Sequence, residues 1–129
     1  MKRILLDTHA LLWWLNGNQQ LGKNSIETIS NQDNDIFVSA ASIWEIAIKK
    51  KKGLLEAPDD FDSIITEEGF KHLPISSYHA EQAGELELHH KDPFDRMLVA
   101  QAQANTTFLW CHQHRFASFQ QTSTPQASY

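Results

Sequence analysis

The sequence is poor in the features that mark several protein classes. Its single cysteine excludes an internal disulfide and a zinc site built from thiolates, and it is typical of a reducing cytoplasm, where we expect the protein. Eleven Lys and Arg against sixteen Asp and Glu give a net charge of −5, which does not favour a strongly basic nucleic-acid binder. Ile4–Leu6 is too short for a signal peptide core, and polar residues interrupt the uncharged stretch 97–114, so we expect no membrane span.

What the sequence does contain is an alternation of short apolar runs and helical patterns, which predicts an α/β fold with a mostly parallel sheet. The expected strands are Ile4–Leu6, Ile36–Val38, Leu73–Ile75 (weakened by Pro74) and, as the last one, Phe108–Trp110. The expected helices are one that runs through Leu11–Leu15 to Gly17, Ser25–Ser30, Ala41–Lys52, a short one capped by Asp60, Tyr78–Leu88 and one that begins after Asp92. We expect a single domain over residues 1–119, followed by a polar, disordered tail over residues 120–129.

Three acidic residues stand at positions where a parallel sheet would gather them. Asp7 directly follows the first apolar run, Glu45 lies in the helix after the second, and Asp95 lies in the first turn of a later helix. Ligands bind at the carboxyl edge of such sheets, and three carboxylates share a small volume only when a cation offsets their repulsion. Oxygen ligands without cysteine favour Mg²⁺ or Mn²⁺, ions that usually act on phosphates.

Each acid also has a purely structural interpretation. Asp7 and Asp92 are suitable N-caps, and Asp95 is favoured near a helix N-terminus by the helix dipole. Glu45 completes a capping box if Ser42 caps its helix. If Ser39 is the cap instead, Glu45 lies deeper in an apolar helix and needs a partner, because a buried unpaired carboxylate is costly.

Other polar groups are weaker candidates. Adjacent His89 and His90 point to different sides and fit a solvated loop better than a metal site. The basic run Lys49–Lys52 complements the C-terminal dipole of its helix, and RNA contact is the minor interpretation. Neither a Gly-rich phosphate loop nor a nucleophile elbow is present, and a phosphoacceptor domain would need a second acid where Thr8 follows Asp7.

Three segments together resemble the PIN-domain ribonucleases, and more narrowly the VapC-like toxins of toxin–antitoxin pairs. They are LLDTHALLWWL (5–15), VSAASIWEIAIKK (38–50) and DPFDRMLVAQA (92–102). The resemblance implies a three-layer α/β/α sandwich, Mg²⁺- or Mn²⁺-dependent hydrolysis of RNA, a homodimer and a cognate antitoxin. It places the metal-binding catalytic acids at Asp7, Glu45 and Asp95. By the same resemblance, Thr8, Ser39 and Asp92 are auxiliary residues.

The resemblance fails at the fourth acid. The family's last strand usually ends in a T-x-D motif, but Cys111-His112-Gln113 stands here, so that Gln113 replaces the acid. Two hypotheses remain open: an active ribonuclease toxin, or a weakened or inactive PIN-fold protein that serves as an antitoxin-binding partner. The three tryptophans Trp13, Trp14 and Trp44 in two short helices also predict a homodimer, unless a single chain can bury all of them.

Overall fold

The protein is described by a computed structural model that covers residues 1–87, 92–105, 108–111 and 115–118. Its centre is a five-stranded sheet in the order β3-β2-β1-β4-β5, in which the first four strands are parallel and β5 pairs antiparallel with β4. The strands are β1 (Arg3–Leu6), β2 (Asp35–Ser39), β3 (Lys71–Leu73), β4 (Phe108–Cys111) and β5 (Arg115–Ser118). The predicted mostly parallel sheet is therefore confirmed.

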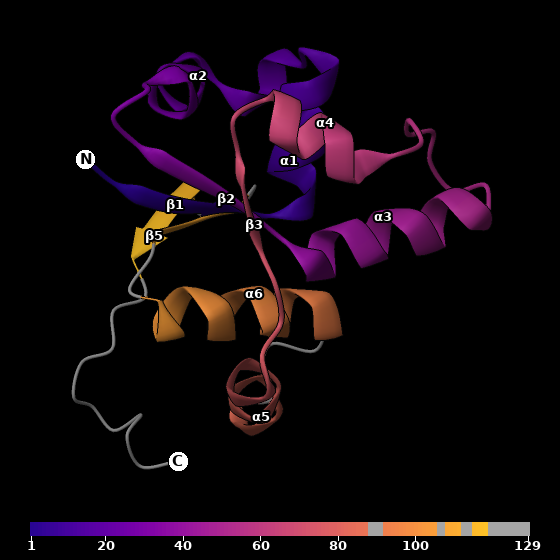
Figure 1. Ribbon diagram of the computed structural model, residues 1–129, viewed down its shortest axis with the longest axis vertical. Coiled ribbons are helices and arrows are strands. Elements are labelled where there is room, and N and C mark those ends of the chain that lie inside the picture. Colours follow the sequence, from indigo (N-terminus) through magenta and orange to yellow (C-terminus); the bar gives the residue numbers. More distant parts are fainter. Residues whose placement is uncertain (88–91, 106–107, 112–114, 119–129) are drawn as a thin grey trace.

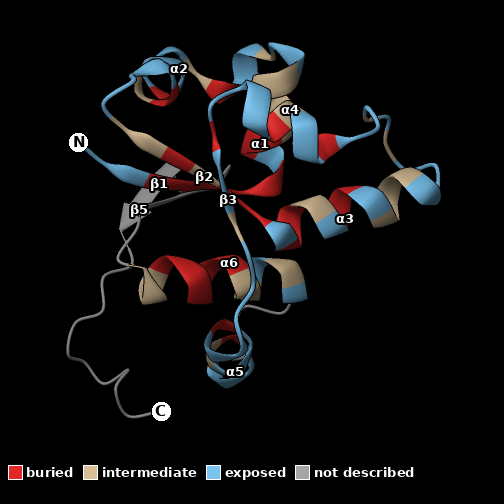
Figure 2. Cartoon of the chain, in the orientation of Figure 1, coloured by how far each residue is buried: buried red, intermediate tan, exposed pale blue. Residues whose placement is uncertain are grey.

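The central strand β1 explains why the sheet is covered on both faces. Ile4, Leu5 and Leu6 have no solvent exposure, as expected of a strand buried on both sides. Because side chains alternate along a strand, Ile4 and Leu6 belong to one core cluster and Leu5 to another. Figure 2 shows this buried centre between helices. The three-layer α/β/α prediction is confirmed.

The helices form the outer layers (Figure 1). One face carries α1 (Thr8–Asn16), α2 (Lys23–Ser30) and α4 (Phe61–Glu67), and the other carries α6 (Pro93–Ala104), with α5 (Ser77–Glu85) packed on α6. The helix α3 (Ala40–Lys51) begins at the end of β2 and contacts both α1 and α6. It therefore bridges the two layers at the carboxyl edge of the sheet. None of the helices in the described part of the chain is long and apolar enough to cross a membrane.

The clearest differences from the predicted elements lie at two strands and two helices. The third strand covers Lys71–Leu73 rather than 73–75. Pro74 follows it, because proline has no N–H group to donate to the neighbouring strand. The strand β5 was not expected, because RFAS is not an apolar run and its register comes from pairing with β4.

Two helix starts also differ. Asp60 precedes α4 but makes no side-chain capping bond, and its backbone is left-handed at φ 62°. Helix α5 begins at Ser77 with Ser76 as N-cap and ends at Glu85, earlier than the predicted Leu88, which lies outside the described residues. Ser76 forms a capping box with His79, a type of box that a search for Glu or Gln at the third position does not find.

Candidate active site

Asp7 joins the central strand to the first helix. It follows β1, is only 4% exposed, and acts as the N-cap of α1, where its Oδ1 accepts a hydrogen bond of 2.8 Å from the Ala10 N–H. Capping of this kind stabilises a helix by about 1 kcal/mol. The capping interpretation of Asp7 is thus correct, and it holds the carboxylate at the carboxyl end of β1.

Glu45 is the buried acid of the site. Ser39 caps α3 by accepting the Ala41 N–H at 2.9 Å, so Glu45 lies in the second turn and is only 6% exposed. Its Oε1 accepts a hydrogen bond of 2.7 Å from the Thr8 hydroxyl, and its Oε2 accepts one of 2.7 Å from Lys49 Nζ. The prediction that Glu45 needs a partner if Ser39 is the cap is confirmed, and the partners come from α1 and from α3 itself.

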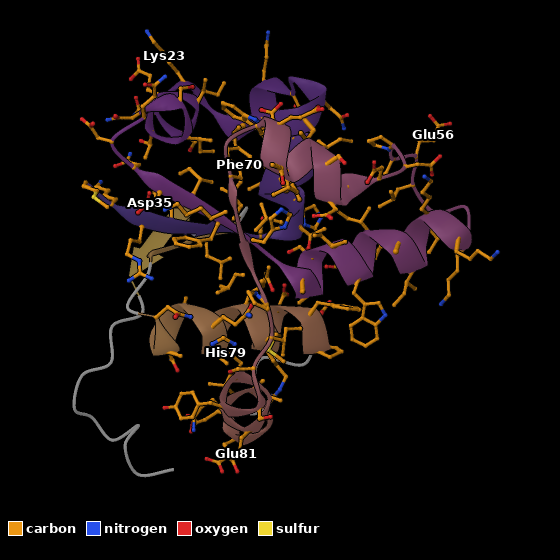
Figure 3. The ribbon with its side chains drawn as sticks, viewed as in Figure 1. Lys23, Asp35, Glu56, Phe70, His79 and Glu81 are labelled. Atoms are coloured by element: carbon orange, nitrogen blue, oxygen red, sulfur yellow. The ribbon has the colours of Figure 1, made fainter. Side chains whose placement is uncertain are left out.

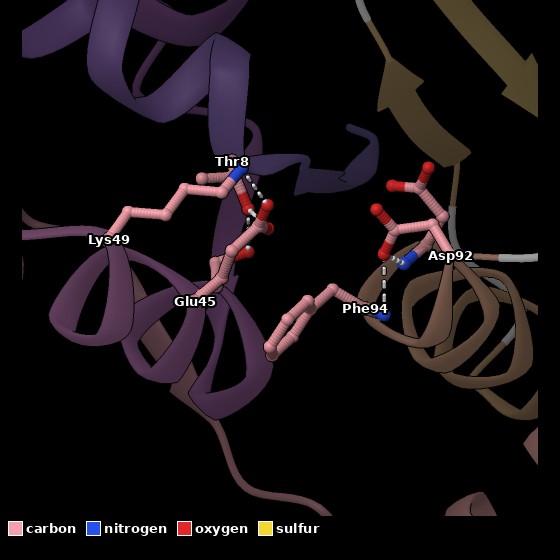
Figure 4. A network of polar contacts seen from close by, with 7 residues as sticks. Thr8, Glu45, Lys49, Asp92 and Phe94 are labelled. Carbon is pink, nitrogen blue, oxygen red and sulfur yellow. Dashed lines mark hydrogen bonds and ion pairs between the residues drawn. The ribbon is translucent and has the colours of Figure 1, made fainter. Parts of the chain in front are cut away.

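Asp92 and Asp95 come from the start of α6. Asp92 is the N-cap, and its Oδ1 accepts hydrogen bonds from the N–H groups of Phe94 at 2.8 Å and Asp95 at 3.2 Å. Figure 4 shows Asp92 on α6 across from the group formed by Thr8, Glu45 and Lys49, with the Phe94 ring extending towards α3. Both aspartates are exposed, so these negative charges stand at the open side of the site.

The Lys49 ammonium interacts with acids of both α3 and the start of α6. Its hydrogen bond with Glu45 raises the pKa of the Lys49 ammonium above the usual value, an effect that burial opposes and that the negative charges of Glu45, Asp92 and Asp95 reinforce. One ammonium group is therefore stabilised by three of the acids at once. Sequence reasoning assigned Lys49 to a solvated basic run, although its spacing of four residues from Glu45 was a usable signal for an ion pair.

The arrangement does not form a ready-made metal cage. Within the ranges that the structure describes, no three His, Cys, Asp or Glu side chains stand at metal-binding spacing. Lys49 contacts Glu45 directly, while Asp92 and Asp95 act on its ammonium only through their charge, and Thr8, the residue after Asp7, donates a hydrogen bond to Glu45. Gln113, His89 and His90 lie outside the described residues.

The Ser39 side chain belongs to a different hydrogen-bond network. Its hydroxyl donates a hydrogen bond of 2.6 Å to Gln101 Oε1, and Gln101 Nε2 donates to the Pro74 carbonyl at 3.2 Å and lies 3.3 Å from His79 Nδ1. Gln101 is fully buried in α6, and His79 lies between α5 and α6 (Figure 3). Gln101 was not predicted from the sequence. A glutamine inside the apolar run LVAQA could have indicated a buried polar residue that needs hydrogen-bond partners.

Arg96, which follows Asp95 in α6, has a structural role. Its guanidinium donates hydrogen bonds to the carbonyls of four residues at the end of α5 and just after it: Ala83, Gly84, Leu86 and Glu87. It therefore satisfies carbonyls that the end of α5 would leave unpaired.

The rim of the site carries an aromatic pair. The Trp44 and Phe94 rings meet edge to face with centroids 5.3 Å apart, and Trp44 is 61% exposed, whereas Trp13 and Trp14 are half-buried against the core. Of the three tryptophans considered for a dimer, Trp44 is thus the one left uncovered.

Comparison with protein families gives a match to the PIN domain over residues 4–107. Comparison with curated protein sequences gives no match.

The fold is similar to several solved structures. VapBC2 from Rickettsia felis, bound to a DNA fragment from its promoter, has a TM-score of 0.61 at 18% identity and covers 84% of this chain and 86% of that chain. A toxin–antitoxin complex from Klebsiella pneumoniae has a TM-score of 0.58 at 23% identity, with 84% of each chain covered. DNA-bound VapBC from Salmonella typhimurium has a TM-score of 0.56 at 16% identity and covers 93% and 96%.

Proposed function

The chain belongs to the PIN domain family, and from this premise we propose that it is a metal-dependent endoribonuclease and the toxin of a toxin–antitoxin pair. The observation that carries the proposal is the buried Glu45 carboxylate, which is held between Thr8 and Lys49 and lies across from the acidic start of α6 (Figure 4). A fold needs no such charge for its stability, because burying ions costs more than burying apolar groups of similar size. A buried, paired carboxylate at the carboxyl edge of the sheet therefore supports a chemical role.

The donor set fits a hard divalent cation. Asp7, Glu45 and Asp95 supply carboxylate oxygens, which Mg²⁺ and Mn²⁺ prefer, and the stabilised Lys49 ammonium indicates that positive charge is favoured among the acids. We propose that these three acids would hold the ion. When bound, such an ion lowers the pKa of its water and offsets negative charge on a phosphate.

The remaining residues position the acids. Thr8 fixes Oε1 of Glu45 through its 2.7 Å hydrogen bond, so that the carboxylate cannot rotate freely. Asp92 fixes the first turn of α6 by accepting two backbone N–H groups, one of them from Asp95 itself. Fixed carboxylates favour catalysis because their orientation is set before the substrate binds.

An antitoxin partner is supported by the fold, since two of the similar structures are VapBC assemblies and the third is a toxin–antitoxin complex. With RNA as substrate and an antitoxin as partner, we expect the protein in the cytoplasm.

A homodimer is the second partner that we propose. Trp44 and Phe94 line a hollow of about 260 Å³ whose wall is mostly apolar. Exposed aromatic side chains beside an apolar hollow favour a contact with another protein surface. A sedimentation experiment that gives a monomer of 14.8 kDa at tens of micromolar would contradict the homodimer.

The proposed activity is tested with purified, antitoxin-free protein and total bacterial RNA, with Mg²⁺ or Mn²⁺ or with neither. Asp7→Asn should lower cleavage at least ~100-fold, because a neutral amide offers the ion no charge. Asp33→Asn, an equal change on an exposed residue of the turn before β2, is the matched control and should cleave like the wild type. Equal cleavage by wild type and Asp7→Asn would overturn the assignment.

Gln113 supports the alternative of a weakened toxin. A neutral glutamine at the fourth acid position brings no charge to the ion, so we expect a high demand for metal, and Gln113→Asp should lower the Mg²⁺ concentration that cleavage requires. An inactive protein that only binds antitoxin would not arrest the growth of a bacterial host on expression, whereas an active toxin would.

A further inference from the structure

Lys49 occupies an unusual position for a surface lysine. Its Nζ lies 2.7 Å from Oε2 of Glu45, whose side chain is 7% exposed, while 40% of the lysine side chain remains in contact with solvent. The other oxygen of Glu45 accepts the Thr8 hydroxyl at 2.7 Å. Both oxygens of the buried carboxylate are therefore engaged, one by a neutral hydroxyl and the other by a cation that extends inward from the rim.

The charges around Lys49 come from two helices. Asp92 and Asp95 on α6 act electrostatically on the same ammonium that binds Glu45 on α3. The next residue, Lys50, instead pairs with the exposed Asp59. Of these two neighbouring lysines, only Lys49 places its charge among acids that the family resemblance assigns to metal binding.

We propose that the Lys49 ammonium is a built-in cation of the metal-free site, and that it competes with a divalent ion for the Glu45 carboxylate. This inference rests on the proposed function only in taking a divalent ion as the ligand. Lys49 is on this view a positioning residue: it keeps Glu45 and the α6 acids together without metal, and it sets how much metal the site requires.

The competition follows from charge and from the shape of the lysine side chain. A divalent ion at Glu45 would lie within a few ångströms of the ammonium, and like charges repel strongly where few water molecules screen them. Lysine has a flexible four-carbon stem and a strongly hydrated head, so the ammonium can withdraw into solvent when the ion binds. Thr8 has no charge and can keep its hydrogen bond to Glu45 in both states.

The test is the binding of Mn²⁺ alone, without RNA, measured by titration calorimetry and by the loss of free Mn²⁺ signal in electron paramagnetic resonance. Lys49→Met removes the charge and keeps a long apolar stem. We expect it to bind Mn²⁺ about three- to tenfold more tightly than the wild type, a coupling of ordinary size between two ligands. The control Lys51→Met makes the same change on an exposed residue of the same helix and should stay within about twofold of the wild type.

Melting temperatures with and without Mn²⁺ show whether the variants are folded. Without metal, Lys49→Met should melt below the wild type because Glu45 loses its partner, and saturating Mn²⁺ should narrow this gap. If Lys49→Met does not fold, Lys49→Gln replaces it, since glutamine keeps a hydrogen-bond donor without the charge.

The outcomes separate this inference from the proposed function. Unchanged or weaker Mn²⁺ binding in the Lys49 variant would overturn the competition, even if the wild type cleaves RNA. Tighter binding in a protein that cleaves no RNA would support the competition and contradict the nuclease. Absence of Mn²⁺ binding in the wild type and both variants would overturn the inference together with the metal dependence.

Discussion

Two buried polar networks begin at the ends of neighbouring strands, and they differ in charge. The first starts after β1 and links Thr8, Glu45 and Lys49. The second starts at the end of β2 and links Ser39 to Gln101, with His79 beside it. The first ends in an ammonium that is stabilised by exposed acids of α6, whereas the second joins groups that are neutral and lie inside the protein.

The comparison shows which kind of buried polar group indicates function. A neutral network costs little if its hydrogen bonds are made, and it fixes how α6 packs against β2 and the segment before α5. A buried charge costs more and is retained where a site needs it. We therefore assign the nuclease chemistry to the Thr8–Glu45–Lys49 network and a structural role to the Ser39–Gln101 network.

Among the residues that only support the acids, the largest effect is expected from Thr8→Val, which keeps the shape of the side chain and removes the hydroxyl that orients Glu45. Cleavage of total RNA should fall about 10- to 100-fold, as is usual when a partner of a metal-binding carboxylate is lost. Cleavage rates at saturating Mn²⁺ measure this effect. An unchanged rate would mean that Glu45 does not need Thr8.

In the second network, by contrast, we expect a substitution to lower the stability of the fold and to leave RNA cleavage unchanged. Gln101→Leu leaves the Ser39 hydroxyl without its acceptor, so we expect the free energy of unfolding to fall by about 1–3 kcal/mol. The folded fraction should cleave RNA at the wild-type rate. Urea denaturation and activity per folded molecule measure the two effects separately.

The smallest effect concerns pH. Burial lowers the pKa of His79 below its usual value, although a backbone interaction with Pro74 partly opposes this shift. The folded protein therefore binds the proton less readily than the unfolded chain, and the stabilisation is full above the unfolded pKa of about 6.5 and is lost as the pH falls towards the folded pKa.

We expect the melting temperature to fall between pH 7 and pH 5 more steeply in the wild type than in His79→Gln. A parallel pH dependence of the two proteins would contradict this. The exposed His9 offers a control, since His9→Gln should change the slope less than His79→Gln does.

Much of the fold could be predicted because its signals are local. The apolar run Ile4–Leu6 predicts a buried strand, and Asp92-Pro93 predicts the start of α6. The edge strands were harder: β3 is polar, and β5 owes its register to β4. The residues of an edge strand do not by themselves predict which strand it pairs with or in which register.

The site was predictable only in part for a similar reason. The acids could be found from their positions after strands and at helix starts. Lys49 and Gln101 were missed because their roles depend on which side of the helix faces which neighbour. That the Ser39 hydroxyl donates to Gln101 is likewise a property of packing, which the sequence pattern does not contain.

The most direct measurement compares Glu45→Gln with Gln101→Leu in one RNA cleavage experiment. Both changes affect a buried polar side chain at the carboxyl edge of the sheet, and both proteins are assayed per folded molecule with Mg²⁺ or Mn²⁺. We predict that Glu45→Gln loses at least ~100-fold in cleavage because the site loses a charge, while Gln101→Leu keeps the wild-type rate. Equal cleavage by Glu45→Gln and the wild type would contradict the assignment of the charged network to catalysis.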